Sequence, residues 1–251
     1  IGIVEEIQAR GFGPIGGSLS LADALAVLYG SVMRYDSQNP QWPDRDKLVC
    51  SKGHAGPAVY AALAVKGFFP YEDLKTLNQP GTYLPSHCDK NKTPGVDMTT
   101  GSLGQGTSLA VGIALGDRLK GRDSRTYLLV GDGESNEGQV WEAAMAASHH
   151  DLKNLVAIVD CNGVQINGWV NDIMTVEPLA DKWRAFGWKV VEVNGHNMKD
   201  GTMFGRLTQY EKSIDYLKAH PFVDFSTLWH QERYVIFAVV DVSLDTSSEN
   251  F

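Results

Sequence analysis

The chain has 251 residues, of which 43% are hydrophobic and 21% charged. This is enough for one large domain or two small ones, and we expect a single domain over residues 1–251. The formal net charge of −8 argues against nucleic acid or an anionic membrane as the main partner. No run of about 18 apolar residues occurs, which predicts no transmembrane helix. The N-terminal sequence lacks a signal-peptide arrangement and the three cysteines lack metal-ligand spacing, so we expect a cytoplasmic protein.

The start of the chain predicts two helices joined by a loop. Residues 1–10 predict a short helix, and the glycines and proline of residues 11–18 predict the loop. Ser18 or Ser20 is a candidate N-cap for a second helix over about residues 21–28, because a serine hydroxyl can accept from the first free N–H groups.

Two histidines lie in turns that follow this region. Residues 48–50 predict a short strand, which leads into a turn with His54 and then a helix from about Pro57. A further helix is predicted within residues 66–79, and His87 lies in the loop beyond it. By pattern alone, a lone histidine in a turn is more often structural than functional, although its side chain titrates near neutral pH.

A glycine-rich loop, TTGSLGQG at residues 99–106, precedes a helix that we expect to end near Gly121. Glycines at a helix N-terminus leave N–H groups open to an anion, but they also allow close packing of helix on sheet. The pattern alone favours neither explanation. Its spacing is GxxGxG rather than GxGxxG, so we exclude a nicotinamide dinucleotide site.

The middle of the chain predicts a β–α–β unit. Residues 126–130 and 155–159 are short apolar runs typical of buried strands, and residues 139–148 have helical spacing between them. Such a crossover pairs the two strands in parallel and brings their carboxyl ends to one edge of the sheet.

Oxygen-bearing side chains follow both of these strands. Asp132 comes directly after the first strand and Asn162 just after the second, so we expect them to be neighbours. With the carbonyl of Val164 they form a set of hard oxygen ligands that suits Mg²⁺ or Ca²⁺. Gly131 and Gly133 would let the backbone approach a phosphate. The alternative is an ordinary strand-end turn, because Gly-Asp-Gly alone is a common triplet.

The last part of the chain predicts further alternation of helix and strand. Residues 179–186 predict a helix ended by Gly187, and residues 188–193 predict a strand. Residues 209–219 and 233–242 are compatible with one more helix and one more strand.

Four blocks of this sequence resemble the transketolase family of thiamine diphosphate enzymes. They are SKGHAGPAVYAAL, TTGSLGQG, GDGESNEGQVWEAAMAA and LKNLVAIVDCNGVQINGW. The resemblance is closest to transketolases encoded as two chains, of which this would be the N-terminal one. It implies a doubly wound, mainly parallel α/β sheet with helices on both faces, in the thiamine diphosphate-binding fold. Residues 201–251 are poorly matched.

The resemblance also implies roles for individual residues. The metal would be held by Asp132, Asn162 and Val164. Catalytic roles fall on His54, His87 and Glu137, the last in a hydrogen-bonded chain that joins active sites across a dimer interface, together with Glu142. The residues implied in cofactor binding are His54, Gly101, Ser102, Leu103, Gly131, Asp132, Gly133, Glu134, Asn162, Val164, Gln165 and Ile166. For Glu134, an exposed carboxylate at a helix start is the alternative interpretation.

The function implied is transfer of a two-carbon ketol unit from a ketose phosphate to an aldose, with thiamine diphosphate and Mg²⁺ or Ca²⁺. Pentose phosphates are the default substrates, and branched or sulfonated sugars stay open. The family activates its cofactor with a glutamate on a pyrimidine-binding domain. The resemblance therefore implies a separately encoded C-terminal partner subunit, in a heterotetramer with sites at interfaces.

One departure from the family pattern leaves alternatives open. Pro14 stands where the family carries a histidine near the reacting carbons, and proline cannot transfer a proton. The chain could therefore be a binding subunit without chemistry. Another thiamine diphosphate enzyme, such as a dehydrogenase E1 α-chain, shares GDG…N but not the other blocks. A metal-independent phosphate-binding α/β protein is disfavoured by the spacing of Asp132 and Asn162.

Overall fold

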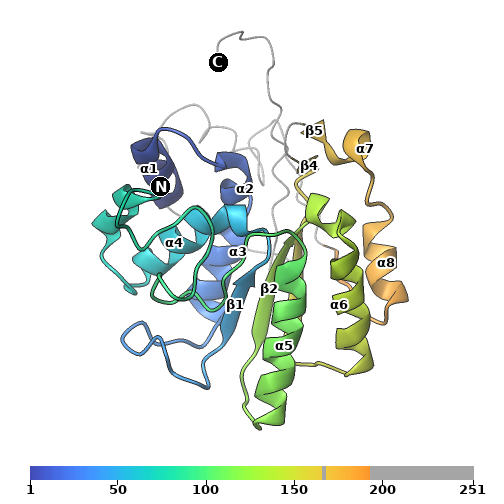
Figure 1. The fold of residues 1–251 in the computed structure, drawn as a ribbon. Helices are drawn as coiled ribbons and strands as arrows, with labels where there is room; N and C mark the ends of the chain where they lie inside the picture. Colours follow the sequence, from blue (N-terminus) through green and yellow to red (C-terminus); the bar gives the residue numbers. More distant parts are fainter. Residues whose placement is uncertain (166–167, 193–251) are drawn as a thin grey trace, which may run out of the picture.

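The computed structural model describes residues 1–165 and 168–192 (Figure 1). Its main sheet has three parallel strands. They are β1 (Lys47–Cys50), β2 (Thr126–Gly131) and β3 (Leu155–Asp160), in the order β1-β2-β3. The register places Cys50 opposite Leu129 and Gly131 opposite Asp160. The predicted β–α–β unit is confirmed, and all three strands have their carboxyl ends at the same edge.

Both faces of this sheet are covered, because side chains of β2 alternate between two hydrophobic cores. Tyr127 and Leu129 pack in one core, whereas Leu128 and Val130 pack in the other. A strand buried on both faces explains the uninterrupted apolar run at this position. The predicted doubly wound arrangement is therefore confirmed.

The helices divide between the two cores (Figure 1). The first core takes side chains from α1 (Gly2–Arg10), α3 (Ala22–Val27), the π-helical turn η1 (Leu28–Val32) and α4 (Gly56–Val65). The second core takes them from α5 (Gln105–Leu119), α6 (Gly138–His149), α7 (Val170–Ile173) and α8 (Leu179–Ala185).

Several short elements connect these layers. They are α2 (Ile15–Leu19), the 3₁₀ turns η2 (Gly53–Ala55), η3 (Tyr71–Thr76) and η4 (Gly133–Asn136), and the antiparallel pair β4 (Val164–Gln165) and β5 (Gly168–Trp169). Two of the 3₁₀ turns, η2 and η4, lie directly beyond the carboxyl ends of β1 and β2, where the sequence places its candidate residues.

Four local predictions were wrong. Residues 15–18, expected in a loop, belong to the short helix α2. Where a helix is expected within residues 66–79, the structure has the 3₁₀ turn η3. A 3₁₀ turn repeats every three residues, and Leu74 and Leu77, which are three residues apart, are both buried. Neither Ser18 nor Ser20 caps α3, because the Ser20 hydroxyl is bonded to a buried carboxylate instead. Residues 188–192 form no strand, and Trp188 Nε1 donates to Ala144 of α6 at 3.0 Å.

The remaining predictions of secondary structure fall on residues 193–251 and lie outside the described residues. They are the last residue of the strand over 188–193, the helix over 209–219 and the strand over 233–242.

One stretch, Ile15–Val32, is long and apolar enough to span a membrane by length and composition, with a mean hydropathy of 1.4. A core helix of a soluble protein meets the same criterion. Here the stretch is divided between α2, α3 and η1, and Leu21, Leu25 and Leu28 are buried in the first core. Packing therefore explains these three leucines, whereas Ile15 and Leu19 are exposed and 33% of the stretch is buried.

An unpaired acid lies within the first core. Glu6 is fully buried on the face of α1 that also buries Ile3 and Ile7, and neither of its oxygens has a hydrogen-bond partner among the described residues. Burial raises the pKa of Glu6 from 4.5 to about 9, because a charge without partners is poorly tolerated there.

We expect Glu6→Gln to stabilise the protein, increasingly so as the pH rises. A carboxyl whose pKa is raised in the folded state contributes its full stability below the unfolded pKa, and loses it between pH 4.5 and about 9. Thermal unfolding of both proteins at pH 5, 7 and 9 measures this, with the largest gain at pH 9. A gain that is equal at all three pH values would contradict the buried-acid explanation.

Candidate functional site

The carboxylate of Glu134 joins three segments at the carboxyl edge of the sheet. Glu134 Oε1 accepts from Ser51 Oγ at 2.5 Å and from the Gly104 backbone N at 2.8 Å, and Oε2 accepts from the Gly131 N at 3.0 Å. Burial raises the pKa of Glu134, while the bonds from Ser51, Gly104 and Gly131 lower it. The interpretation as an exposed helix-start carboxylate is wrong, because the residue is only 3% exposed.

Asp132 and Asn162 are neighbours, as their strand-end positions predict. Asp132 Oδ2 accepts from the backbone N of Gly163 at 2.7 Å, which ties the end of β2 to the loop after β3. Asp132 Oδ1 accepts from the Gly133 N at 2.8 Å, and Asn162 Oδ1 from the Val164 N at 3.0 Å. Burial raises the pKa of Asp132, partly offset by the two N–H bonds.

These residues fit a divalent metal held with an anionic group. A carboxylate, an amide oxygen and nearby backbone carbonyls are hard ligands of the kind that Mg²⁺ and Ca²⁺ take. The Gln165 side chain packs so closely against Gly133 that a Cβ at position 133 would lie 2.7 Å from Gln165 Cβ. Gln165 Nε2 is buried and has no partner among the described residues, so one donor at this edge is left for an acceptor such as a phosphate oxygen.

His87 lies against the glycine-rich loop, and the turn that carries His54 packs on the same loop through Gly53. The backbone of Gly53 lies so near Gly101 that a Cβ would approach Gly101 N to 2.8 Å. A Cβ at Gly101 would lie 3.6 Å from the His87 ring, and one at Gly17 would lie 3.2 Å from the His54 ring. Burial, then the charges of Lys52 and His87, lower the pKa of His54. The structure thus brings both histidines to one edge.

Other predicted residues border this cluster. Ser102 and Leu103 are exposed at the start of α5. Glu137 is also exposed. It packs against Gly104, where an added Cβ would lie 2.8 Å from Glu137 Cβ. Glu142 is exposed on α6. Ile166 lies outside the described residues.

The sequence analysis missed two charged residues at this edge. Lys52 and Asp160 form a buried ion pair between the ends of β1 and β3. The sequence did contain an indication of this pair. Lys52 closely follows one apolar strand and Asp160 ends another, and a charge buried at such a position needs a partner. The identity of the partner could not be read from the sequence, because 108 residues separate the two.

Pro14 is exposed and precedes the first turn of α2. Three residues later, within α2, a Cβ added at Gly17 would lie 3.2 Å from the His54 ring, so Pro14 precedes the short helix that packs near His54.

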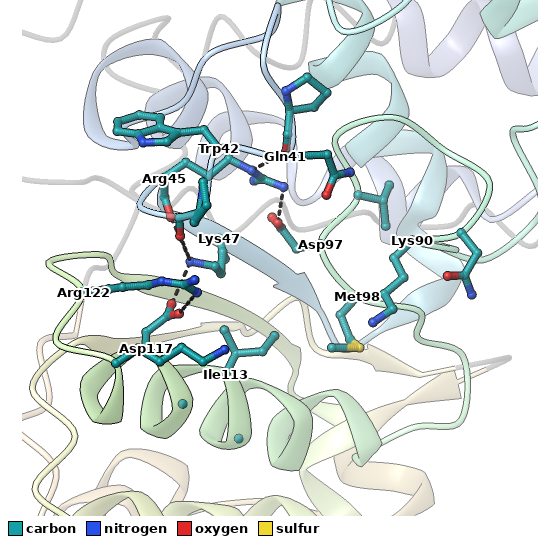
Figure 2. Close-up of a pocket in the computed structure, with 17 residues that line it drawn as sticks. Gln41, Trp42, Arg45, Lys47, Lys90, Asp97, Met98, Ile113, Asp117 and Arg122 are labelled. Carbon is teal, nitrogen blue, oxygen red and sulfur yellow. Dashed lines mark hydrogen bonds and ion pairs between the residues drawn. The ribbon is translucent and has the colours of Figure 1, made fainter.

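A separate cavity of about 580 Å³ lies at the other end of β1. Figure 2 shows Arg45 directed at Asp97, and Asp117 between Lys47 and Arg122. The Arg45 Nη2–Asp97 Oδ1 distance is 2.5 Å and the Lys47 Nζ–Asp117 Oδ2 distance is 2.7 Å. The acids in this cavity are thus paired with cations, and none of the predicted site residues lines it.

Comparison with known proteins agrees with this geometry. The family described as "Transketolase, thiamine diphosphate binding domain" matches residues 2–205. The 6-deoxy-6-sulfo-D-fructose transketolase subunit SqwG of Clostridium sp. (strain MSTE9) is 57% identical, over 77% of this chain and 70% of that protein. One of the apulose-4-phosphate transketolase subunits, from Phocaeicola vulgatus, is 41% identical, over 87% of this chain and 75% of that protein.

Solved transketolase structures share the fold. A transketolase variant of Pichia stipitis has a TM-score of 0.73 at 33% identity, over 84% of this chain and 32% of that chain. The transketolase of Leishmania mexicana has a TM-score of 0.72 at 34% identity, over 84% of this chain and 33% of that chain.

We expect Glu134→Ala to lower the free energy of unfolding by about 2–6 kcal/mol. The change leaves the Gly104 and Gly131 N–H groups buried without an acceptor, at about 1–3 kcal/mol each. Denaturant titration measures the loss. The control is Glu137→Ala, an exposed glutamate three residues away, which should shift stability by less than about 0.5 kcal/mol. Equal effects of the two changes would show that Glu134 does not hold the edge together.

Proposed function

Because this chain belongs to the transketolase family, we propose that it is a subunit of a thiamine diphosphate-dependent transketolase that transfers a two-carbon ketol unit from a ketose phosphate to an aldose. The observation that carries the proposal is the convergence of Asp132, Asn162 and the Gly101 loop at one edge of the sheet.

In the proposed site, Asp132, Asn162 and the Val164 carbonyl hold Mg²⁺ or Ca²⁺. The cofactor, when bound, supplies the carbon–carbon bond chemistry that amino-acid side chains lack. Gly131 and Gly133 would contact its diphosphate through backbone atoms, because their side-chain positions face Glu134 and Gln165. Gln165 offers its unpaired Nε2 donor to the same group.

In this proposal, the two histidines make polar contacts with the substrate and the cofactor. The lowered pKa of His54 favours the neutral imidazole, in which one nitrogen donates and the other accepts. His87 is exposed beside Gly101, where an entering sugar would meet it, and can hold or move a proton at a substrate oxygen. Glu137, exposed beside Gly104, would act across a subunit contact rather than on substrate.

A partner chain completes the proposed enzyme. The similar proteins of Clostridium and Phocaeicola are named as subunits, whereas the chain spans about a third of the solved single-chain transketolases. We propose a C-terminal partner that carries the pyrimidine-binding domain, with two copies of each chain and sites at their interfaces. We also propose that the protein is cytoplasmic and that it binds neither nucleic acid nor membrane.

The substrate class is a ketose with an acidic group. Pentose phosphates are the starting proposal for the family. A sulfonated ketose is the specific alternative, because the Clostridium protein named for 6-deoxy-6-sulfo-D-fructose is 57% identical. A panel of both kinds of donor, tested with one aldose acceptor, separates them.

A second candidate function is a binding subunit without chemistry. Pro14 favours it, since the residue precedes α2, whose Gly17 packs near the His54 ring, and a proline side chain can neither transfer a proton nor donate a hydrogen bond.

We expect Asp132→Ala to abolish metal-dependent binding of thiamine diphosphate. The change removes the one carboxylate of the proposed ligand set. Calorimetric titration of the cofactor into the chain with its partner subunit, with Mg²⁺ or with EDTA, measures the effect. The control is Asp123→Ala, a carboxylate whose side chain is fully exposed. Unchanged binding in Asp132→Ala, or no binding by the unaltered chain, would overturn the proposed site.

We expect the unaltered subunit pair to turn over a ketose donor, and Pro14→His to change the rate constant more than cofactor affinity. Steady-state kinetics and calorimetry on the same samples separate the two quantities. Cofactor binding without turnover in the unaltered pair, with turnover restored by Pro14→His, would establish the binding-subunit alternative.

A further inference from the structure

A buried ion pair lies beside the proposed metal ligands. The Lys52 side chain is 2% exposed and the Asp160 side chain 7% exposed, and Lys52 Nζ contacts Asp160 Oδ2. Lys52 Nζ also donates to the Gly17 carbonyl at 2.8 Å and to Ser20 Oγ at 3.2 Å. A buried ammonium requires such partners, so the pair, the carbonyl and the hydroxyl hold one another in place.

The same carboxylate oxygen contacts Asn162. Asp160 Oδ2 accepts from Asn162 Nδ2 at 3.2 Å and from Ser20 Oγ at 2.6 Å. On its other side, Asn162 Oδ1 accepts from the Val164 backbone N at 3.0 Å. An ionised carboxylate only accepts and a backbone N–H only donates, so both contacts require the amide nitrogen to face Asp160.

This orientation matters because only the oxygen of an asparagine amide binds a hard cation. The amide nitrogen faces Asp160, and the oxygen faces the loop that starts at Gly163. The Gly163 N–H is bonded to Asp132 Oδ2, so that loop also contacts the carboxylate of the proposed ligand set. An amide rotated by half a turn would present its N–H₂ group to the cation instead.

We propose that Lys52 and Asp160 are positioning residues for the divalent metal: their buried ion pair holds the Asn162 amide with its oxygen toward the cation. The inference rests on the proposed function. It assigns a role in the proposed metal site to two residues that touch neither metal nor substrate. Ser20 belongs to the same network, which links the end of β3 to the loop before α3.

The test replaces the ion pair without leaving a buried charge. Lys52→Met/Asp160→Leu removes both charges together and keeps side chains of similar size, so the fold does not have to bury an unpaired ion. It also removes the acceptor for Asn162 Nδ2. The companion variant Lys52→Met/Asp160→Asn is equally uncharged but keeps an amide oxygen at position 160.

Two measurements are made on each variant with its partner subunit. Calorimetric titration of Mg²⁺ in the presence of thiamine diphosphate gives the metal affinity, and thermal unfolding in EDTA gives the stability of the metal-free protein. We expect the Met/Leu variant to bind Mg²⁺ roughly 10–100-fold more weakly, as is typical when the partner of a metal ligand is removed. We expect the Met/Asn variant to recover part of that loss.

The matched control is the ion pair of Arg45 and Asp97, at the other end of β1. Their side chains are 9% and 5% exposed, with Nη2 and Oδ1 2.5 Å apart. Arg45→Met/Asp97→Leu should change thermal stability without changing the affinity for Mg²⁺. A loss of metal affinity in this control as large as in the Met/Leu variant would overturn the positioning role, because any buried pair would then have the same effect.

The remaining outcomes separate the two proposals. Wild-type affinity in a folded Met/Leu variant overturns the positioning role and leaves the proposed function intact. If that variant does not fold, Lys52→Met/Asp160→Ala decides, because it also lacks the acceptor but places a smaller side chain at position 160. Wild-type affinity there overturns the role as well. No metal-dependent cofactor binding by the unaltered subunit pair overturns the proposed function and the inference together.

Discussion

The buried carboxylate of Glu134 is the contact on which the carboxyl edge of the sheet depends. Three segments end or begin there, and each would otherwise leave a polar group buried without a partner. Glu134 accepts from Ser51 after β1, from Gly104 before α5 and from Gly131 at the end of β2. One side chain therefore fixes the turn that leads to His54, the glycine-rich loop and the strand end that carries Asp132 relative to one another.

Close backbone approach is the second constraint at this edge. A Cβ at Gly106 would come within 2.5 Å of Ser51 Cα, and one at Gly53 within 2.8 Å of the Gly101 N. At these positions the lack of a side chain is required by neighbouring backbone. The glycine-rich loop therefore serves close packing, and it still leaves Ser102 and Leu103 exposed at the start of α5. Of the two explanations that the sequence left open for this loop, close packing is confirmed, whereas anion binding stays a prediction.

Charge is distributed unevenly through the interior. At the carboxyl edge, the acids are hydrogen-bonded or paired: Asp132 to two backbone N–H groups, Glu134 to three donors and Asp160 to Lys52. At the other end of β1, Asp97 and Asp117 are paired with cations. Glu6 is different, since neither of its oxygens has a partner in the described part of the chain. The burial of its unpaired carboxyl works against stability near neutral pH.

The sequence by itself determined the β–α–β unit, the parallel edge and the placing of Asp132 beside Asn162. These follow from local patterns: apolar runs of strand length, helical spacing between them, and the parallel pairing of a crossover. Four short blocks of sequence were enough to indicate the family, and residues 2–205 match it.

Only the tertiary structure decided which polar groups meet. Glu134 and Ser51 are 83 residues apart and Lys52 and Asp160 are 108 apart, so no periodicity links them. The failed serine caps have the same origin, because the Ser20 hydroxyl bonds to Asp160 from a distant strand rather than to its own helix. Local sequence sets which backbone forms helix or strand. The partners of buried charges depend on which strand ends come together in space.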